Sequence, residues 1–172
     1  MEEVIEVVET AQVFGMSIGQ ILALLGAAIA VILSGMGSSK GVGLAGETSA
    51  GVSTENPEVS SKLLVLQLLP ATQGIYGFLV GVIVLINTNV LGGAMKAVDL
   101  YQGLGILVSC LPVAIVGYYS AIRQGRVAAS GMLLTGQRPE MSGKAITMTV
   151  MVETYAVFAL LVSFLMVNAI NL

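Results

Sequence analysis

The chain has 172 residues, of which 56% are hydrophobic and only 10% are charged, and its mean hydropathy is +0.94. This composition excludes an ordinary soluble domain and predicts a protein that lies in the lipid bilayer. The net charge of -3 excludes a nucleic-acid partner, and the absence of His together with a single Cys excludes a disulfide or a Cys/His metal site within one chain.

The chain begins with an acidic stretch and continues as four apolar runs. Residues 1–12 form an acidic N-terminal extension that contains Glu2, Glu3, Glu6 and Glu9. The apolar runs cover residues 13–36, 63–90, 104–122 and 145–170. Each run approaches or exceeds the ~20 residues that a helix needs to span a bilayer. The sequence therefore predicts an all-α membrane protein with four transmembrane helices, arranged as a first hairpin at 13–90 and a second hairpin at 91–172.

The two predicted hairpins repeat each other. The segment Pro-Glu-Val-Ser-Ser-Lys at 57–62 returns as Pro-Glu-Met-Ser-Gly-Lys at 139–144, which is 82 residues later. Nearer the first helix, Gly41 matches Gly125 at a distance of 84 residues, which predicts two extra residues close to the turn of the first hairpin. A repeat of this kind indicates a duplicated helical hairpin with both copies in the same orientation.

The prolines of the repeat mark the hairpin turns, and the basic residues predict on which side of the membrane those turns lie. Six of the seven basic residues lie in or beside the first and third connections, and only Lys96 lies in the second. Positive charge collects on the cytoplasmic side of membrane proteins. We therefore expect an integral protein of a bacterial plasma membrane, with the turns near Pro57 and Pro139 cytoplasmic and both termini outside.

Glu153 lies inside the last apolar run, which contains no basic residue beside it. A carboxylate at this depth costs at least ~2.5–3.5 kcal/mol unless it is neutralised. Three groups could neutralise it: a proton, a bound metal cation, or a cation from another polypeptide. The alternative is a protonated glutamate that only hydrogen-bonds a neighbouring helix. Intramembrane acids are functional by default, and we expect Glu153 to bind the transported ion.

The second apolar run carries a polar face that could complete an ion site. Positions spaced i, i+3, i+4 and i+7 share one helical face, and here they are Leu69, Thr72, Gln73 and Tyr76. Pro70 has no N–H, so it leaves the carbonyl of Leu66 without its helical partner. A metal cation needs several oxygens whereas a proton needs few, so this face favours Na⁺ over H⁺. Ordinary hydrogen bonding between helices is the alternative explanation of Thr72 and Gln73.

These residues resemble a known family. The stretches at 68–78, 124–129 and 152–156 are similar to the proteolipid ring protein (the K or c subunit) of bacterial sodium-translocating V-type ATPases, and the similarity extends from about Phe14 to the end of the chain. The resemblance implies that Na⁺ is held by Glu153, by the backbone carbonyl of Leu69, and by side-chain oxygens of Thr72, Gln73 and Gln124. It also implies that Tyr76 bonds to Glu153. Ala71 stands where the family often has glycine.

The resemblance also implies partners and a mode of action. Copies of the chain are expected to assemble into a rotor ring that turns among lipids, with a membrane stator subunit whose arginine displaces the ion and with central-stalk subunits at the cytoplasmic turns. The chain lacks the Gly-rich phosphate loop of nucleotide-binding proteins, so we expect it to be an ion-translocating subunit and no enzyme by itself. The alternatives are the same rotor carrying H⁺, or a small channel or secondary transporter.

Overall fold

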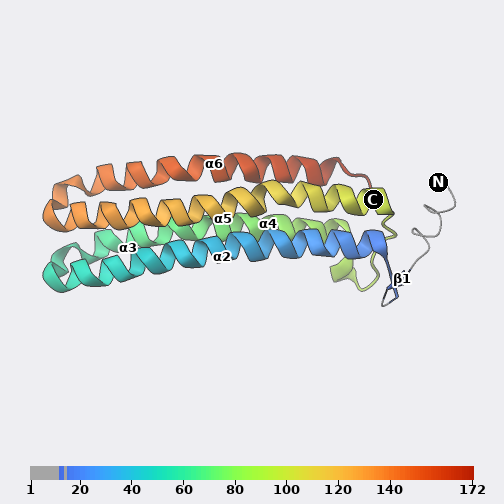
Figure 1. Ribbon diagram of the computed structural model, residues 1–172, viewed down its shortest axis with the longest axis horizontal. Coiled ribbons are helices and arrows are strands. Elements are labelled where there is room, and N and C mark those ends of the chain that lie inside the picture. Colours follow the sequence, from blue (N-terminus) through green and yellow to red (C-terminus); the bar gives the residue numbers. More distant parts are fainter. Residues whose placement is uncertain (1–11, 14) are drawn as a thin grey trace.

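The computed structural model describes residues 12–13 and 15–172, and the glutamates of the predicted acidic extension lie outside them. Long helices run back and forth along one axis, with both proline turns at one end and the C-terminus at the other (Figure 1). We call the end with the two proline turns the tips. The described residues contain four helical segments that are long and apolar enough to cross a membrane. The predicted all-α membrane fold with four spanning helices is therefore confirmed.

The helical segments form two hairpins. The first comprises α2 (Ile18–Glu55), the short helix η1 (Pro57–Val59), α3 (Ser60–Leu68), η2 (Leu69–Ala71) and α4 (Thr72–Asn87). A connection with η3 (Val90–Gly92) leads to the second hairpin, which comprises α5 (Leu100–Gln137), η4 (Pro139–Met141) and α6 (Ser142–Ala169). Two short strands before α2, β1 (Gln12–Val13) and β2 (Met16–Ser17), pair antiparallel with Val13 opposite Met16.

The two long helices α2 and α5 have equal lengths of 38 residues. Each begins with a capping box, at Ser17 and at Asp99, and each ends at the residue before a proline, at Asn56 and at Arg138. Both pairs of caps are 82 residues apart. The expectation of two extra residues in the first hairpin was therefore wrong, because one repeat distance holds from the start of the long helix to the turn.

The helices extend well beyond the apolar runs. Hydropathy falls near Lys40, whereas α2 continues to Glu55. Lys40, Arg123 and Arg126 consequently lie inside helices, and Nζ of Lys40 donates a hydrogen bond of 3.0 Å to the Tyr118 hydroxyl. The continuation is stable because α2 packs along α5, the most extensive helix contact of the molecule. Helical residues without apolar character are retained by this packing.

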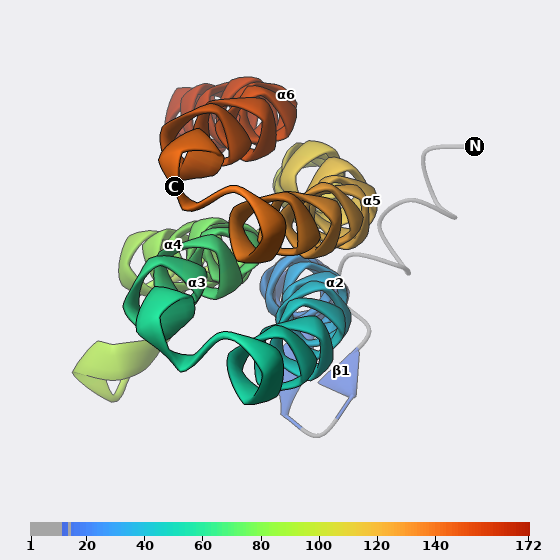
Figure 2. The same ribbon diagram turned by 90° about the vertical axis from the view of Figure 1, so that its left-hand side faces the viewer.

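Glycines permit the close approach of α2 and α5. A Cβ on Gly125 would lie 2.5 Å from the Cα of Gly41, a separation that no side chain tolerates. Small residues allow two backbones to come together in this way in membrane helices. Seen end on, α2 and α5 lie side by side, with α4 beside them and α6 on the far side of α5 (Figure 2).

The buried core has two apolar clusters, one towards each end of the bundle. Ala27, Val80 and Val113 belong to the cluster at the end with the C-terminus, and Leu66 and Met132 belong to the cluster near the tips. The fully buried Gln73 and Gln124 lie along the helices between the two. A layer of buried amides therefore separates the apolar clusters, and this layer adjoins Glu153.

Candidate ion-binding site

Glu153 is half-buried on α6 and receives a hydrogen bond on each carboxylate oxygen. The phenol of Tyr76 on α4 donates to Oε1 over 2.5 Å, and Nε2 of Gln124 on α5 donates to Oε2 over 3.4 Å. Three helices therefore meet at this carboxylate. Tyr76 and Glu153 bond as the resemblance implied, and the structure also places Gln124 beside the acid.

The two glutamine amides bond directly to each other. Nε2 of Gln73 donates to Oε1 of Gln124 over 2.5 Å, and Nε2 of Gln124 also donates to the carbonyl of Thr149 over 3.2 Å. Both side chains are fully buried, where an amide without partners would be costly. Every buried side-chain nitrogen and oxygen in the described part of the chain has a partner. The amides are thus fixed in place as part of one network.

Pro70 introduces a tight turn that brings a backbone oxygen to the same place. The 3-10 turn of η2 separates α3 from α4, and the carbonyl of Leu69 accepts hydrogen bonds from both the backbone N–H and the hydroxyl of Thr72. The hydroxyl lies 3.0 Å from that carbonyl oxygen and 3.4 Å from Oε1 of Gln73. The expectation that Leu66 supplies the oxygen was wrong at this point, because the turn presents Leu69 to the polar group.

Sequence reasoning missed two members of the network. The hydroxyl of Ser120 on α5 donates to the carbonyl of Val152 over 3.1 Å and accepts from Nε2 of Gln73 over 3.3 Å. Thr149 contributes its backbone carbonyl to Gln124. Ser120 could have been found from spacing, because it precedes Gln124 by four residues and so lies on the same helical face. A backbone carbonyl leaves no such signal in a sequence.

The oxygens gathered here suit a cation of low charge. One carboxylate stands among neutral hydroxyl, amide and carbonyl oxygens, and the described residues contain no group of three His, Cys, Asp or Glu side chains that could hold a metal ion. Hard cations prefer oxygen ligands, and a single carboxylate balances the charge of a monovalent ion. Oε1 of Gln124 faces Gln73, so this oxygen would reach an ion beside Glu153 only after the amide rotates.

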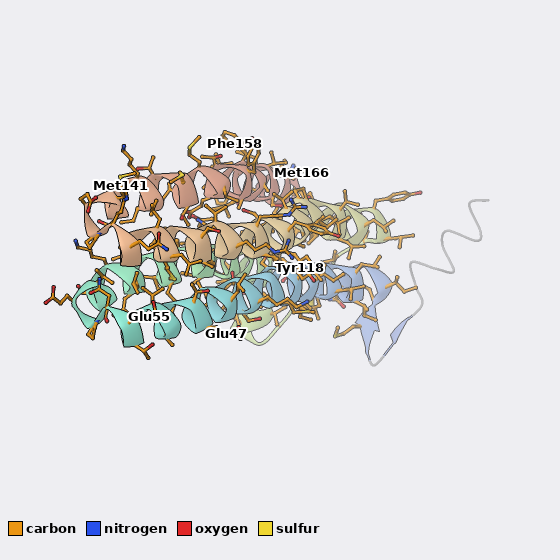
Figure 3. The ribbon with its side chains drawn as sticks, turned by 60° about the vertical axis from the view of Figure 1, so that its left-hand side comes forward. Glu47, Glu55, Tyr118, Met141, Phe158 and Met166 are labelled. Carbon is orange, nitrogen blue, oxygen red and sulfur yellow. The ribbon has the colours of Figure 1, made fainter. Side chains whose placement is uncertain are left out.

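The corresponding place on the other hairpin lacks these groups. Counted by the repeat of 82 residues, the counterparts of Glu153, Gln124, Gln73 and Tyr76 are Ala71, Val42, Tyr155 and Phe158. Phe158 is 62% exposed and lies on the outer side of α6, away from the other helices (Figure 3). The fold thus repeats, whereas the polar site occurs once among the described residues.

The sequence matches a known family twice, in agreement with the repeated fold. The family of the ATP synthase C subunit matches residues 25–84 and again residues 107–166. The chain is 46% identical over 149 residues to the V-type sodium ATPase subunit K of Enterococcus hirae, covering 87% of this chain and 92% of that protein. It is 37% identical over 147 residues to the A-type ATP synthase subunit K of Methanocaldococcus jannaschii, covering 85% of this chain and 61% of that protein.

Proposed function

Because the chain belongs to the family of the ATP synthase C subunit, we propose that it is a rotor-ring subunit of a V-type ATPase and carries Na⁺ across the membrane on Glu153. The observation that carries this proposal is the buried layer around Glu153, in which Gln73 and Gln124 are held within hydrogen-bond distance of each other and of the acid. The similarity to a protein of a sodium ATPase supports Na⁺ as the ion. Catalysis of ATP hydrolysis belongs to other subunits.

The proposed ligands are the Glu153 carboxylate, the carbonyl of Leu69 and the side-chain oxygens of Thr72, Gln73 and Gln124. Sodium sheds its water only where several oxygens replace it, and these five groups come from α4, α5, α6 and η2. Rotation of the Gln124 amide turns its oxygen towards the ion and removes its N–H from the carboxylate. Tyr76 keeps its bond to the other carboxylate oxygen and so orients the acid.

The ion neutralises Glu153, and this lowers the cost of carrying the acid past lipid. In the proposed cycle, copies of the chain form a ring that turns among lipids, and an arginine of the stator displaces Na⁺ from Glu153 into an exit path. The tips face the cytoplasm and contact the central stalk. Two bonds between the hairpins support the tips as one unit, from Lys62 Nζ to the Pro139 carbonyl and from Asn56 Nδ2 to the Gly136 carbonyl, each 3.2 Å long.

The experiment is labelling of Glu153 by a hydrophobic carbodiimide, which attacks protonated carboxyls, in membranes across a pH series with NaCl or with choline chloride. We expect Na⁺ to protect Glu153, and Gln73→Ala to remove the protection. The matched control is Gln67→Ala, which removes an amide on α3 that lies beside Gly46, outside the Glu153 network.

Each other outcome has a definite meaning. Labelling that follows pH alone, with no effect of Na⁺, replaces the sodium rotor with a proton-carrying rotor. Absence of labelling at every pH contradicts the role of Glu153 as an ion carrier and leaves a channel or transporter that uses another route.

A further inference from the structure

The two hairpins bury different faces against each other. Ser34, Gly37 and Gly41 of α2 are buried by the second hairpin. Their counterparts 82 residues later are Val116, Tyr119 and Arg123, which line an open groove between α5 and α6. Tyr119 is 61% exposed. The face that the first hairpin hides inside the chain is therefore left uncovered on the second.

The reverse holds on the opposite side of the molecule. Ile106, Cys110 and Val113 of α5 are buried in the cluster shared with the first hairpin. Their counterparts Leu24, Ala28 and Val31 line an apolar groove between α2 and α4. Each hairpin thus has one face that is covered within the chain and one equivalent face that is open, and the two open faces are different.

We propose that a second copy of this chain covers these faces, so that the α2/α4 groove of one copy docks on the α5/α6 groove of the next. The proposal rests on the rotor ring of the proposed function and names the surfaces that join its members. The internal α2–α5 contact is the template, because the repeat relates it to the contact between copies. Such an interface joins unlike faces and therefore generates a ring rather than a two-fold dimer.

The repeat also gives the residue pairs of this interface. Within the chain, Gly37 abuts the backbone of Tyr118, and Gly41 abuts Gly125. Exchanging hairpins along the repeat places Tyr119 against Met36 of the next copy, and Arg123 against Gly43 of the next copy. A Cβ on Gly43 would meet nothing within 4 Å in this chain, so the space above Gly43 is open for the larger partner.

The two interfaces therefore differ in character. Inside the chain, glycine meets glycine and the backbones touch; between copies, a large aromatic and a cationic side chain meet small residues. Charge complements this arrangement, because Glu47 is exposed on α2 one turn beyond Gly43, where Arg123 of the neighbouring copy can reach it (Figure 3). An arginine within a membrane protein is stabilised by such a partner.

The test uses single-cysteine chains in the intact membrane complex, on a Cys110→Ser background. One chain carries Met36→Cys and a second, with a larger tag, carries Tyr119→Cys; both are co-expressed and then oxidised. We expect disulfide-linked heterodimers in the mixture and none when either chain is expressed alone, because an interface between unlike faces brings only unlike positions together. Met36→Cys with Phe158→Cys is the matched control pair, since Phe158 lies on the outer side of α6.

Absence of the heterodimer overturns the proposed interface, and so does equal cross-linking of the control pair. A second readout is charge exchange: Glu47→Arg should lose the detergent-resistant oligomer, and Glu47→Arg with Arg123→Glu should recover it. No recovery contradicts the ion pair. Na⁺ protection of Glu153, measured in the same membranes, separates the two proposals: protection without the cross-link overturns only the interface, and the cross-link without protection overturns only the sodium function.

Discussion

The phenol of Tyr76 lies 2.5 Å from Oε1 of Glu153, although the two residues are 77 positions apart and belong to different hairpins. The carboxylate of the second hairpin is thus oriented by a donor from the first. Gln73 extends the same relationship, because it reaches from α4 to Gln124 and Ser120 on α5. The site therefore exists only where the two hairpins pack together, and the following predictions address that dependence.

Tyr76→Phe removes the phenol donor and keeps the ring. A hydrogen bond to a charged group contributes about 1.5–3 kcal/mol, so we expect Na⁺ to protect Glu153 at concentrations about 10–100-fold higher. The measurement is the Na⁺ concentration that halves carbodiimide labelling. Tyr101→Phe is the control, because Tyr101 is exposed at the start of α5. An unchanged half-protection concentration in Tyr76→Phe would show that the phenol does not hold the acid for binding.

Ser120→Ala removes the hydroxyl that accepts from Gln73 and donates to the Val152 carbonyl. Neutral hydrogen bonds contribute about 0.5–1.5 kcal/mol each, so we expect Na⁺ affinity to fall about 2–10-fold. Ser120→Thr keeps the hydroxyl and should restore most of the affinity. Ser130→Ala is the control, because that exposed hydroxyl bonds only to the carbonyl of Arg126 on its own helix. Equal affinities for Ser120→Ala and Ser120→Thr would contradict a positioning role.

Ala71→Glu places a carboxylate at the repeat position of Glu153. In a Glu153→Ala background we expect no Na⁺-protected labelling of the new acid, because the counterparts of Gln124 and Tyr76 are Val42 and Phe158, which offer no oxygen. The readout is carbodiimide labelling with and without Na⁺, with the unchanged chain as the positive control. Sodium protection of the carboxylate at position 71 would mean that the acid alone suffices and that the amides are dispensable.

Gly125→Ala tests the close contact of α2 and α5. The new methyl group would lie 2.5 Å from the Cα of Gly41, so the helices must separate, at a cost of about 1–3 kcal/mol. We expect a lower temperature of thermal unfolding in detergent, followed by circular dichroism. Gly51→Ala is the matched control, since its Cβ meets nothing within 4 Å and alanine favours the helix by about 1 kcal/mol. A midpoint for Gly125→Ala at or above that of the unchanged chain would rule out the close contact.

Much of the fold follows from the sequence, because hydropathy reports directly on helices that face lipid. The ends of α2 and α5 did not follow, since the segment beyond Lys40 is polar and glycine-rich and is held by packing against another helix rather than by its own composition. Helical spacing brought Leu69, Thr72, Gln73 and Tyr76 onto one face. Gln124 was different: two flanking arginines favoured a solvated helix end, and only the resemblance indicated its burial.

The pairing of Ala71 with Glu153 across the repeat sets a gear ratio. In a rotor of the proposed kind, a full turn moves one ion for every four helices that pass the stator, where a rotor with an acid on each hairpin would move two. The ATP consumed per turn is fixed by other subunits, so each ion receives a larger share of that energy. Loss of one carboxylate from an ancestral repeat therefore puts the motor in low gear: it moves fewer ions per revolution and can work against a steeper gradient.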